Sequence, residues 1–178
     1  MNIKINLSVA SLDEAIKKVE KYEKEMSEKK NKVCEALADK GVEIAKKEIT
    51  EMATFGNLAD IRASIHKEHR DGKYYVVTRN FKAPYVEFGT GVKGENHQHP
   101  IASEAGWGYM KGHFTVKDGK VGWWYPSNAA DANTTQVQTE NGDLIAFTQG
   151  MPARPFMYNT AKKLKVIAPS VTKEVIKK

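Results

Sequence analysis

The sequence predicts an α+β fold, in which an antiparallel β-sheet built of hairpins is flanked by a long N-terminal helix and a C-terminal helix. Three dipeptides of hairpin type, Asp71-Gly72, Asp118-Gly119 and Asn141-Gly142, each lie between segments rich in strand-forming residues. Apolar residues recur at steps of three and four over residues 12–52, which contain no proline, and again after Phe156. These observations together favour two helices around a set of hairpins.

The N-terminal helix is predicted to start at a capping box that runs from Ser11 to Glu14. Gly41 is a weak point in its interior. A single helix would be about 60 Å long, and a break near residues 27–31 is the alternative. The apolar residues of this helix form a long stripe, which needs a covering surface, and a neighbouring subunit is a candidate for it. The stripe consists of Leu12, Ile16, Val19, Tyr22, Met26, Val33, Leu37 and Ile44.

The three hairpins are expected within a single domain over residues 1–178. Leu58, Ile61 and Ile65 are expected to lead the chain into the first strand. A long variable insertion of loops and hairpins is expected at about 92–150. The predicted strand pairs are 63–70 with 73–79, 113–116 with 121–125, and 135–139 with 144–148. Two polar segments, 92–112 and 127–134, are predicted to be loops, and the first is expected to stay mobile until a partner binds.

The C-terminal helix is predicted to begin around Pro155, since proline suits the first turn of a helix. Pro169 predicts a kink in this helix, or a stop and restart. The apolar stripe of the helix consists of Met157, Ala161, Leu164, Ala168, Val171 and Val175.

The stretch 83–91 is predicted to form or closely approach a strand. Tyr85 and Phe88 suit a half-buried strand, and Pro84 pushes the residue before it towards an extended conformation. The glycines of the Gly-Thr-Gly sequence at 89–91 permit a positive φ or a close approach to another segment.

Glu87 is the only charged residue in this stretch, and a buried carboxylate needs a partner. Arg154 is a candidate, because its planar guanidinium can hold a carboxylate through two hydrogen bonds. The alternative is that Glu87 is solvated on an edge strand.

Three motifs occur in a fixed order along the chain. They are Gly56-Asn57-Leu58 with Ser64-Ile65, then Tyr85-x-Glu87-Phe88-Gly89-Thr90-Gly91, and then Ala153-Arg154-Pro155-Phe156. In these motifs the chain resembles a family of tailed-bacteriophage head–tail joining proteins, also called tail-completion or tail-component proteins and common in prophages. The likeness covers the chain from about Lys46 onward, apart from residues between Gly91 and Gly150, where the segment is longer than the family needs.

The resemblance implies a structural virion protein of the neck, and not an enzyme. Copies would assemble into a homo-oligomeric ring, with six subunits as the expected number, around the channel through which DNA passes. The other implied partners are the head adaptor or stopper and the tail tube proteins. Both a head-side joining protein and a tail terminator fit. The protein would be made in the host bacterial cytoplasm and end in the virion.

The resemblance also implies roles for individual residues. The fold core and subunit interface would involve Tyr85, Glu87, Phe88, Gly89, Thr90, Gly91, Arg154, Pro155 and Phe156. The two loops, with Trp107, would contact partners. Trp107, Trp123 and Trp124 lie in aromatic clusters that are typical of cores and protein interfaces, although such clusters also stack on sugars or bases.

The amino-acid composition narrows the classes of protein to which the chain can belong. The chain has 178 residues, of which 40% are hydrophobic and 28% charged, and no run reaches the length of a membrane helix. We expect no membrane partner and no secretion signal. The net charge of +6 leaves a nucleic-acid-binding module as an alternative, with lysines concentrated at 17–47 and 162–178. Glutamates interleave the first of these blocks, which favours a solvated helix face.

A metal-dependent enzyme is the other alternative. His97 and His99, two residues apart, could ligate zinc together with His113 or Glu95. A glycine-rich loop that happens to carry imidazoles explains the same pattern, and no nucleophile, phosphate-loop or dinucleotide motif occurs. The sequence therefore predicts no cofactor, and the lone Cys34 is interpreted as a packing residue.

Overall fold

The computed structural model describes residues 8–52, 58–109, 112–127 and 136–177, and it has the predicted α+β fold. The helices are α1 (Val9–Glu51), α2 (Ala59–Ser64), α3 (Ala83–Phe88), α4 (Gly91–Asn96) and α5 (Phe156–Lys177). The strands are β1 (His66–Arg70), β2 (Lys73–Val77), β3 (Thr115–Lys117), β4 (Lys120–Pro126), β5 (Gln136–Gln138) and β6 (Leu144–Thr148). None of the helices in these ranges has a stretch long and apolar enough to cross a membrane.

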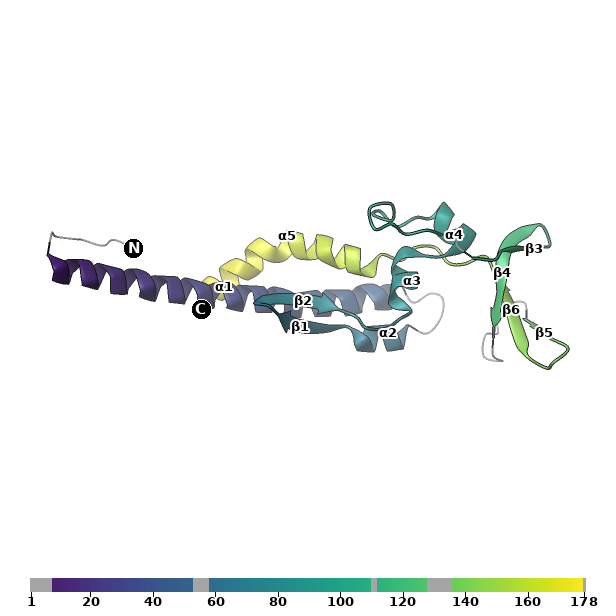
Figure 1. Cartoon of the computed structure of the whole chain (residues 1–178), viewed down its shortest axis with the longest axis horizontal. Helices are drawn as coiled ribbons and strands as arrows, with labels where there is room; N and C mark the ends of the chain where they lie inside the picture. The colour runs from purple at the N-terminus through teal and green to yellow at the C-terminus, as the bar shows by residue number, and fades with distance from the viewer. Residues whose placement is uncertain (1–7, 53–57, 110–111, 128–135, 178) are drawn as a thin grey trace.

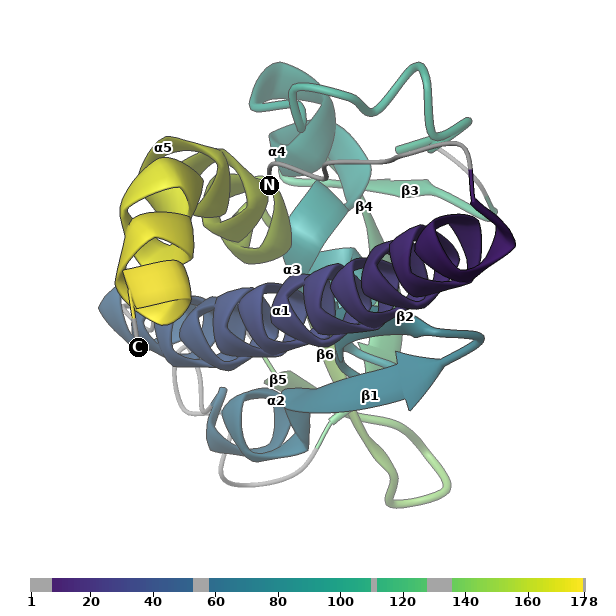
Figure 2. The same cartoon turned by 90° about the vertical axis from the view of Figure 1, so that its left-hand side faces the viewer.

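The molecule is elongated, and α1 runs along most of its length (Figure 1). The C-terminal half of α1 lies between α5 on one side and the β1–β2 hairpin on the other (Figures 1 and 2). A separate four-stranded antiparallel sheet, in the order β3-β4-β6-β5, lies at the far end beyond α3 and α4. The N-terminal half of α1 projects in the opposite direction, past the ends of α5 and the hairpin.

Helix α1 is a single helix of 43 residues, so the alternative of a break near residues 27–31 is wrong. It begins at Val9, earlier than predicted. Ser8 is its N-cap and accepts a hydrogen bond from the Ser11 backbone N–H at 3.3 Å. Residues 53–57 lie outside the described residues, and with them Gly56 and Asn57 of the first motif.

Gly41, which appeared to be a weak point in α1, lies where three elements meet. A Cβ atom at this position would lie 2.6 Å from Cγ2 of Val76 in β2 and 3.0 Å from Cδ1 of Leu164 in α5. The absence of a side chain therefore allows β2 and α5 to approach the same turn of α1, which outweighs the lower helix propensity of glycine.

The hydrophobic core lies where α1, α2, α3 and α5 converge. Phe156, at the start of α5, is fully buried and is the largest such side chain in the described residues. It belongs to one hydrophobic cluster with side chains of α1, α2 and α3. The core residues are Ala45, Ile49, Ile61, Ile65, Ala83, Val86 and Phe156.

The predicted stripe of α5 lies largely on the side of that helix that is buried or half-buried, but Ala161 is exposed. Thr160 is buried in its place, and its hydroxyl donates a hydrogen bond to the Phe156 carbonyl. Pro169 does not stop the helix, which continues to Lys177. The ribbon bends towards α1 over its C-terminal part (Figure 1), as the predicted kink required.

The β1–β2 hairpin turns at Asp71 and Gly72, whose φ angles are 52° and 69°. Two positive φ angles are what a two-residue type I′ turn requires, which explains the Asp-Gly sequence. The residues before the hairpin form the short helix α2, whereas a strand was predicted from residue 63. Ile61 and Ile65 are fully buried, so helical burial accounts for their spacing.

The other two predicted hairpins form the far sheet. Asp118 and Gly119, with φ angles of 50° and 72°, join β3 to β4. Asn141 and Gly142 lie in the loop between β5 and β6, and Gly142 has a φ of 87°. The central pair, β4 and β6, aligns Trp124 with Phe147.

A charged cluster on the β1–β2 hairpin is expected to make the stability of the protein vary with pH in the acid range. Burial opposes the charge of Glu68, but hydrogen bonds from His66 and Arg79 outweigh it and lower the pKa of the Glu68 carboxyl from 4.5. A carboxyl with a lowered pKa stabilises the fold above its unfolded pKa, and this stabilisation is lost as the pH falls through its folded pKa. We therefore expect Glu68→Gln to lose less stability than the wild type as the pH falls below about 4.5. Urea unfolding between pH 7 and pH 3 measures this, with Glu28→Gln as the control, and parallel curves for Glu68→Gln and wild type would contradict it.

Candidate functional site

The candidate site is the junction between the segments 83–91 and 150–156, which are far apart in the sequence. Residues 83–88 of the first segment form helix α3, so the prediction of a strand there is wrong. Pro84 lies in the first turn of α3, where the lack of an N–H is tolerated, and Ala83 before it is also helical. Gly89 ends the helix with a φ of 78°.

The two segments are joined by an antiparallel bridge between Thr90 and Met151. The Thr90 N–H donates to the Met151 carbonyl at 2.8 Å, and the Met151 N–H donates back to the Thr90 carbonyl at 3.1 Å. The Arg154 N–H donates to the Val86 carbonyl at 2.9 Å. Backbone hydrogen bonds therefore join the two motifs at more than one point.

The glycines of the motifs are required by this close backbone approach. A Cβ atom at Gly89 would lie 2.5 Å from the Ala153 nitrogen, and one at Gly150 would collide with the Thr90 carbonyl. A Cβ at Gly91 would lie 2.5 Å from Cζ3 of Trp123. The predicted close approach at 89–91 is thus made to the second motif and to strand β4.

The two ends of the segment that forms the far sheet both lie beside the first turn of α4. The Gly91 N–H donates to the Tyr109 carbonyl at 3.0 Å, and the Lys93 N–H donates to the Gln149 carbonyl at 3.2 Å. Tyr109 lies just before this segment and Gln149 lies at its end. The first turn of α4 therefore holds both ends of the segment that carries β3 to β6.

Gly150→Ala is expected to destabilise the protein more than Gly142→Ala. The two glycines have nearly the same φ, 86° and 87°. However, a Cβ at Gly142 would have only the Gln138 side chain nearby, at 3.9 Å. Both substitutions place alanine at nearly the same unfavourable positive φ, so this penalty is equal for the two. The collision with Thr90 should add about 1–3 kcal/mol to the loss of stability for Gly150→Ala. Urea unfolding followed by circular dichroism measures the difference, and equal losses would show that the close approach is unimportant.

Glu87 is buried at the centre of the junction, with 7% of its surface exposed. Its Oε2 accepts a hydrogen bond from the Met157 N–H at 2.9 Å, and its Oε1 accepts one from the Tyr158 N–H at 2.9 Å. These N–H groups belong to the first turn of α5, where no intrahelical acceptor is available. Glu87 therefore caps α5 from a distant part of the chain, and its charge suits the positive end of the helix dipole.

The side-chain partner of Glu87 is His99, so the prediction of an ion pair with Arg154 is wrong. His99 Nε2 lies 3.1 Å from Oε1 of Glu87. Arg154 is half-buried, and burial lowers the pKa of its guanidinium. The alternative of a solvated Glu87 on an edge strand is wrong as well, because the residue is buried on a helix.

The orientation of the His99 ring fixes its tautomer. The Ile101 N–H donates to Nδ1 at 3.2 Å, so Nδ1 is an acceptor and the proton is on Nε2, which donates to Glu87. The backbone N–H of His99 donates a hydrogen bond to the Tyr109 hydroxyl at 2.9 Å. His99 is 3% exposed, so its surroundings differ from the mobile loop predicted for 92–112. The beginning of that segment is helix α4.

An aromatic cluster surrounds this hydrogen-bond network. Phe88 stacks on Trp107 with ring centroids 5.0 Å apart, and it lies 4.4 Å from the His99 ring. Tyr85 meets Trp107 edge to face at 5.9 Å, and Tyr158 meets His99 at 5.3 Å. Such pairs add about 0.5–1.5 kcal/mol each beyond simple burial. The cluster links α3 and α5 with the segment after α4.

The tryptophans predicted to contact partners are all half-buried within the chain. Trp107 Nε1 donates to the Gly89 carbonyl at 3.0 Å. Trp123 meets Phe114 edge to face, and Trp124 lies under the Lys117 ammonium at 4.7 Å. Each tryptophan thus has neighbours in its own chain.

The three histidines of the proposed metal site have different surroundings. His99 is buried against Glu87, whereas His97 and His113 are exposed. Within the described ranges, no group of three histidine, cysteine, aspartate or glutamate side chains is arranged to hold a metal ion. The carboxylate and imidazole at the junction serve instead to connect helices.

Comparisons with protein-family models, with curated proteins and with solved structures find no match to this chain.

The role of His99 was missed by the sequence reasoning. The signal for it was the single charge at Glu87 among apolar residues, which indicated that a partner was needed. Nothing in the sequence identified which of several polar residues would be the partner. The helix cap was missed for a similar reason, because its two donors are 70 and 71 residues from the acceptor.

Proposed function

We propose that this protein is a structural component of a tailed bacteriophage or prophage particle, which acts in head–tail joining or tail completion at the neck. The observation that carries the proposal is the junction around Glu87. Two of the three motifs behind the family resemblance meet there, through the Thr90–Met151 bridge and the helix cap. Residues that resemble those of the family thus form one connected unit in this chain.

The shape of the molecule supports an assembling role. A long helix that projects beyond its neighbours, and a small sheet at the opposite end, offer two separate surfaces for contacts (Figure 1). An elongated subunit of this kind suits a ring in which each copy touches its neighbours and the rings above and below. The proposed partners are further copies, the head adaptor or stopper, and the tail tube proteins, around a channel for DNA.

Electron microscopy of an induced lysate tests the proposal. The strain would carry a prophage that lacks only this gene, and the control would carry the same deletion complemented from a plasmid. We expect DNA-filled heads and separate tails without the gene, and joined, infectious particles with it. Intact, infectious particles from the deletion strain would refute the neck role.

Location in the particle provides a second test of the same proposal. Gold labelling of an epitope tag at the C-terminus should mark the point where head meets tail in joined particles. Label on the tail tip, or none on purified infectious particles, would contradict the proposal.

A further inference from the structure

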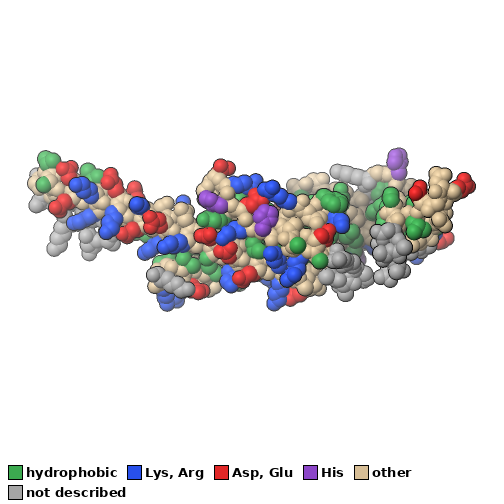
Figure 3. Space-filling view, turned by 90° about the horizontal axis from the view of Figure 1, so that it is seen from below, with side chains coloured by type: hydrophobic (Ala, Val, Ile, Leu, Met, Phe, Trp, Pro, Cys, Tyr) green, Lys and Arg blue, Asp and Glu red, His purple; other side chains and the backbone are tan. Residues whose placement is uncertain are grey.

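One surface of the molecule lacks a partner within the described chain. We define the projecting segment as residues 9–32 of α1, which is about 35 Å long at the helical rise. Every side chain from Ile16 to Lys32 is exposed. Figure 3 shows this segment extending beyond the rest of the molecule, with hydrophobic side chains among charged ones.

The exposed hydrophobic side chains of the projecting segment form a stripe at helical spacing. Their exposed fractions range from 40% for Met26 to 77% for Val9. The apolar stripe consists of Val9, Leu12, Ile16, Val19, Tyr22 and Met26. Single exposed hydrophobics are ordinary, but a contiguous row along a helix marks an interaction surface.

The apolar stripe continues a face that is already covered by helix packing farther along α1. From Met26 the next apolar residue of this face is Val33, two turns on and beyond Lys29 and Lys30. Steps of three and four then lead through Leu37 to Gly41 and Ile44, where α5 lies against α1. The same face therefore contacts α5 in one half of the helix, whereas in the other half its large hydrophobic side chains are exposed, and of residues 9–32 only Ala15 is buried. In the N-terminal half of α1, no described element covers this face as α5 covers it in the C-terminal half.

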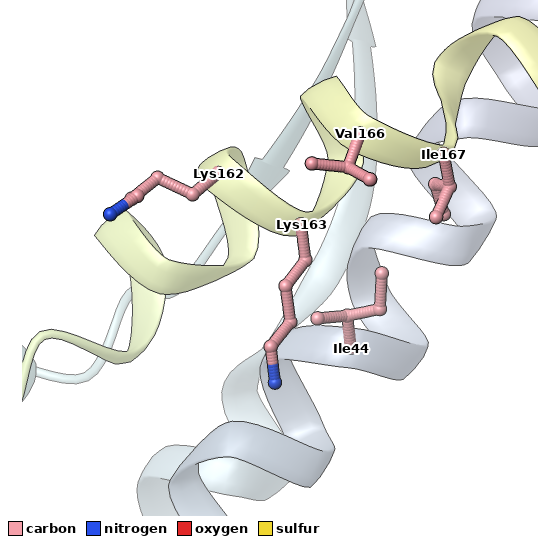
Figure 4. A pocket seen from close by; sticks show the side chains of 5 residues that line it. All are labelled: Ile44, Lys162, Lys163, Val166 and Ile167. Carbon is pink, nitrogen blue, oxygen red and sulfur yellow. The ribbon is translucent and has the colours of Figure 1, made fainter.

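A second exposed apolar surface lies beside this packed half. Ile44 of α1 and Val166 and Ile167 of α5 line an open groove of about 380 Å³, together with Lys162 and Lys163 (Figure 4). Val166 is 79% exposed. The Lys163 ammonium bonds to Glu48 on α1, whereas Lys162 points away from that pair.

The charges of the two surfaces permit one specific ion pair, although the projecting segment carries seven lysines as well as six carboxylates. Helix α5 carries five lysines and one glutamate. On the projecting segment, helical spacing places Asp13 and Glu20 on one side of the apolar stripe and Glu23 within it, between Val19 and Met26. A carboxylate at such a position needs a cation when the stripe is covered, and Lys162 at the groove can supply it.

We propose that the projecting segment of one copy docks into the α1–α5 groove of the next copy, with Glu23 paired to Lys162. Each copy then presents two different surfaces, so the contact is head-to-tail. Contacts of this type close into rings when the rotation between copies permits. The inference rests on the proposed function, since it assigns the surfaces by which copies would form the neck ring.

A disulfide experiment on the purified protein tests the contact. Cys34 is exposed and is the only cysteine, so Cys34→Ser gives a thiol-free background. Ile16→Cys and Val166→Cys are then introduced singly and together. A bond within one chain is excluded, because Ile16 lies about 40 Å along α1 from Ile44 at the groove.

After oxidation we expect the double cysteine variant to give a ladder of covalent oligomers on a non-reducing gel, and each single variant to stay monomeric. Val116→Cys, at a position 67% exposed on the far sheet, replaces Val166→Cys in the control and should give no ladder with Ile16→Cys. Covalent dimers from Ile16→Cys alone would mean that two projecting segments pair with each other. That result, or an absence of crosslinking in the double variant, would overturn the proposal.

Exchange of the two charges tests the pairing within the contact. Glu23→Lys and Lys162→Glu should each weaken self-association by about tenfold or more in sedimentation equilibrium, and the double variant should recover it. Equal weakening in the double variant would refute the pair. Thermal melts by circular dichroism should be unchanged, because both residues are exposed.

The crosslinking experiment and the deletion experiment can fail independently of each other. A covalent ladder together with normal particles from the deletion strain would leave the contact and remove the neck function. Separated heads and tails together with a purified protein that does not crosslink would leave the neck function and remove this contact.

Discussion

Glu87→Ala is expected to destabilise the protein by about 3–5 kcal/mol. The substitution leaves the N–H groups of Met157 and Tyr158 and the Nε2–H of His99 without the acceptor that they share. Each buried donor left unsatisfied costs about 1–3 kcal/mol. Urea unfolding at pH 7 measures the loss. Glu95→Ala, on the exposed side of α4, is the control and should change stability by less than about 0.5 kcal/mol.

A double-mutant cycle identifies the partner of Glu87. Glu87→Ala and His99→Ala should be non-additive by about 0.5–3 kcal/mol, because each removes the same hydrogen bond. A loss for Glu87→Ala as small as that for Glu95→Ala would show that the carboxylate is solvated and does not cap α5. Additive losses would show that His99 and Glu87 do not interact.

Phe156→Ala is expected to cost about 3–5 kcal/mol, since it removes a fully buried aromatic ring where four helices meet. The same chemical change at Phe81, which is 76% exposed, is the matched control and should alter stability by less than about 0.5 kcal/mol. Phe156→Leu should fall in between, because it keeps part of the volume. Chemical unfolding of the three variants under one set of conditions gives the comparison.

Similar losses for Phe156→Ala and Phe81→Ala would contradict this account of the core. A small loss at Phe156 alone would mean that the surrounding helices collapse onto the space, since the cost of such a deletion depends on how much of the cavity remains.

Local chemistry explains which parts of the fold were predictable. The Asp-Gly turn at residues 71–72 depends on the φ angles of two residues, so the sequence determines it locally. The long helix follows from a period repeated over many turns. By contrast, residues 83–88 have strand-forming side chains but are helical, because tertiary packing of Ala83 and Val86 in the core outweighs a weak local preference.

The candidate site was less predictable, for a related reason. The sequence indicated that a buried Glu87 needs a partner, and it offered Arg154 of the third motif as a candidate. The choice between Arg154 and His99 depends on where the backbone places each side chain, and sequence spacing carries no such information. Gly41 likewise appeared to be a defect, because only the packed structure brings Val76 and Leu164 to its surface.

The way in which α4 holds both ends of the far sheet has a consequence for how this protein can change. The carbonyls of Tyr109 and Gln149 accept hydrogen bonds from N–H groups two residues apart, at Gly91 and Lys93. The ends of the intervening chain are thus held close together whatever its length, and the entropy of closing a loop grows only slowly with loop length. Evolution or an engineer can therefore lengthen, shorten or exchange this module while the helical body keeps its hydrogen bonds and its core.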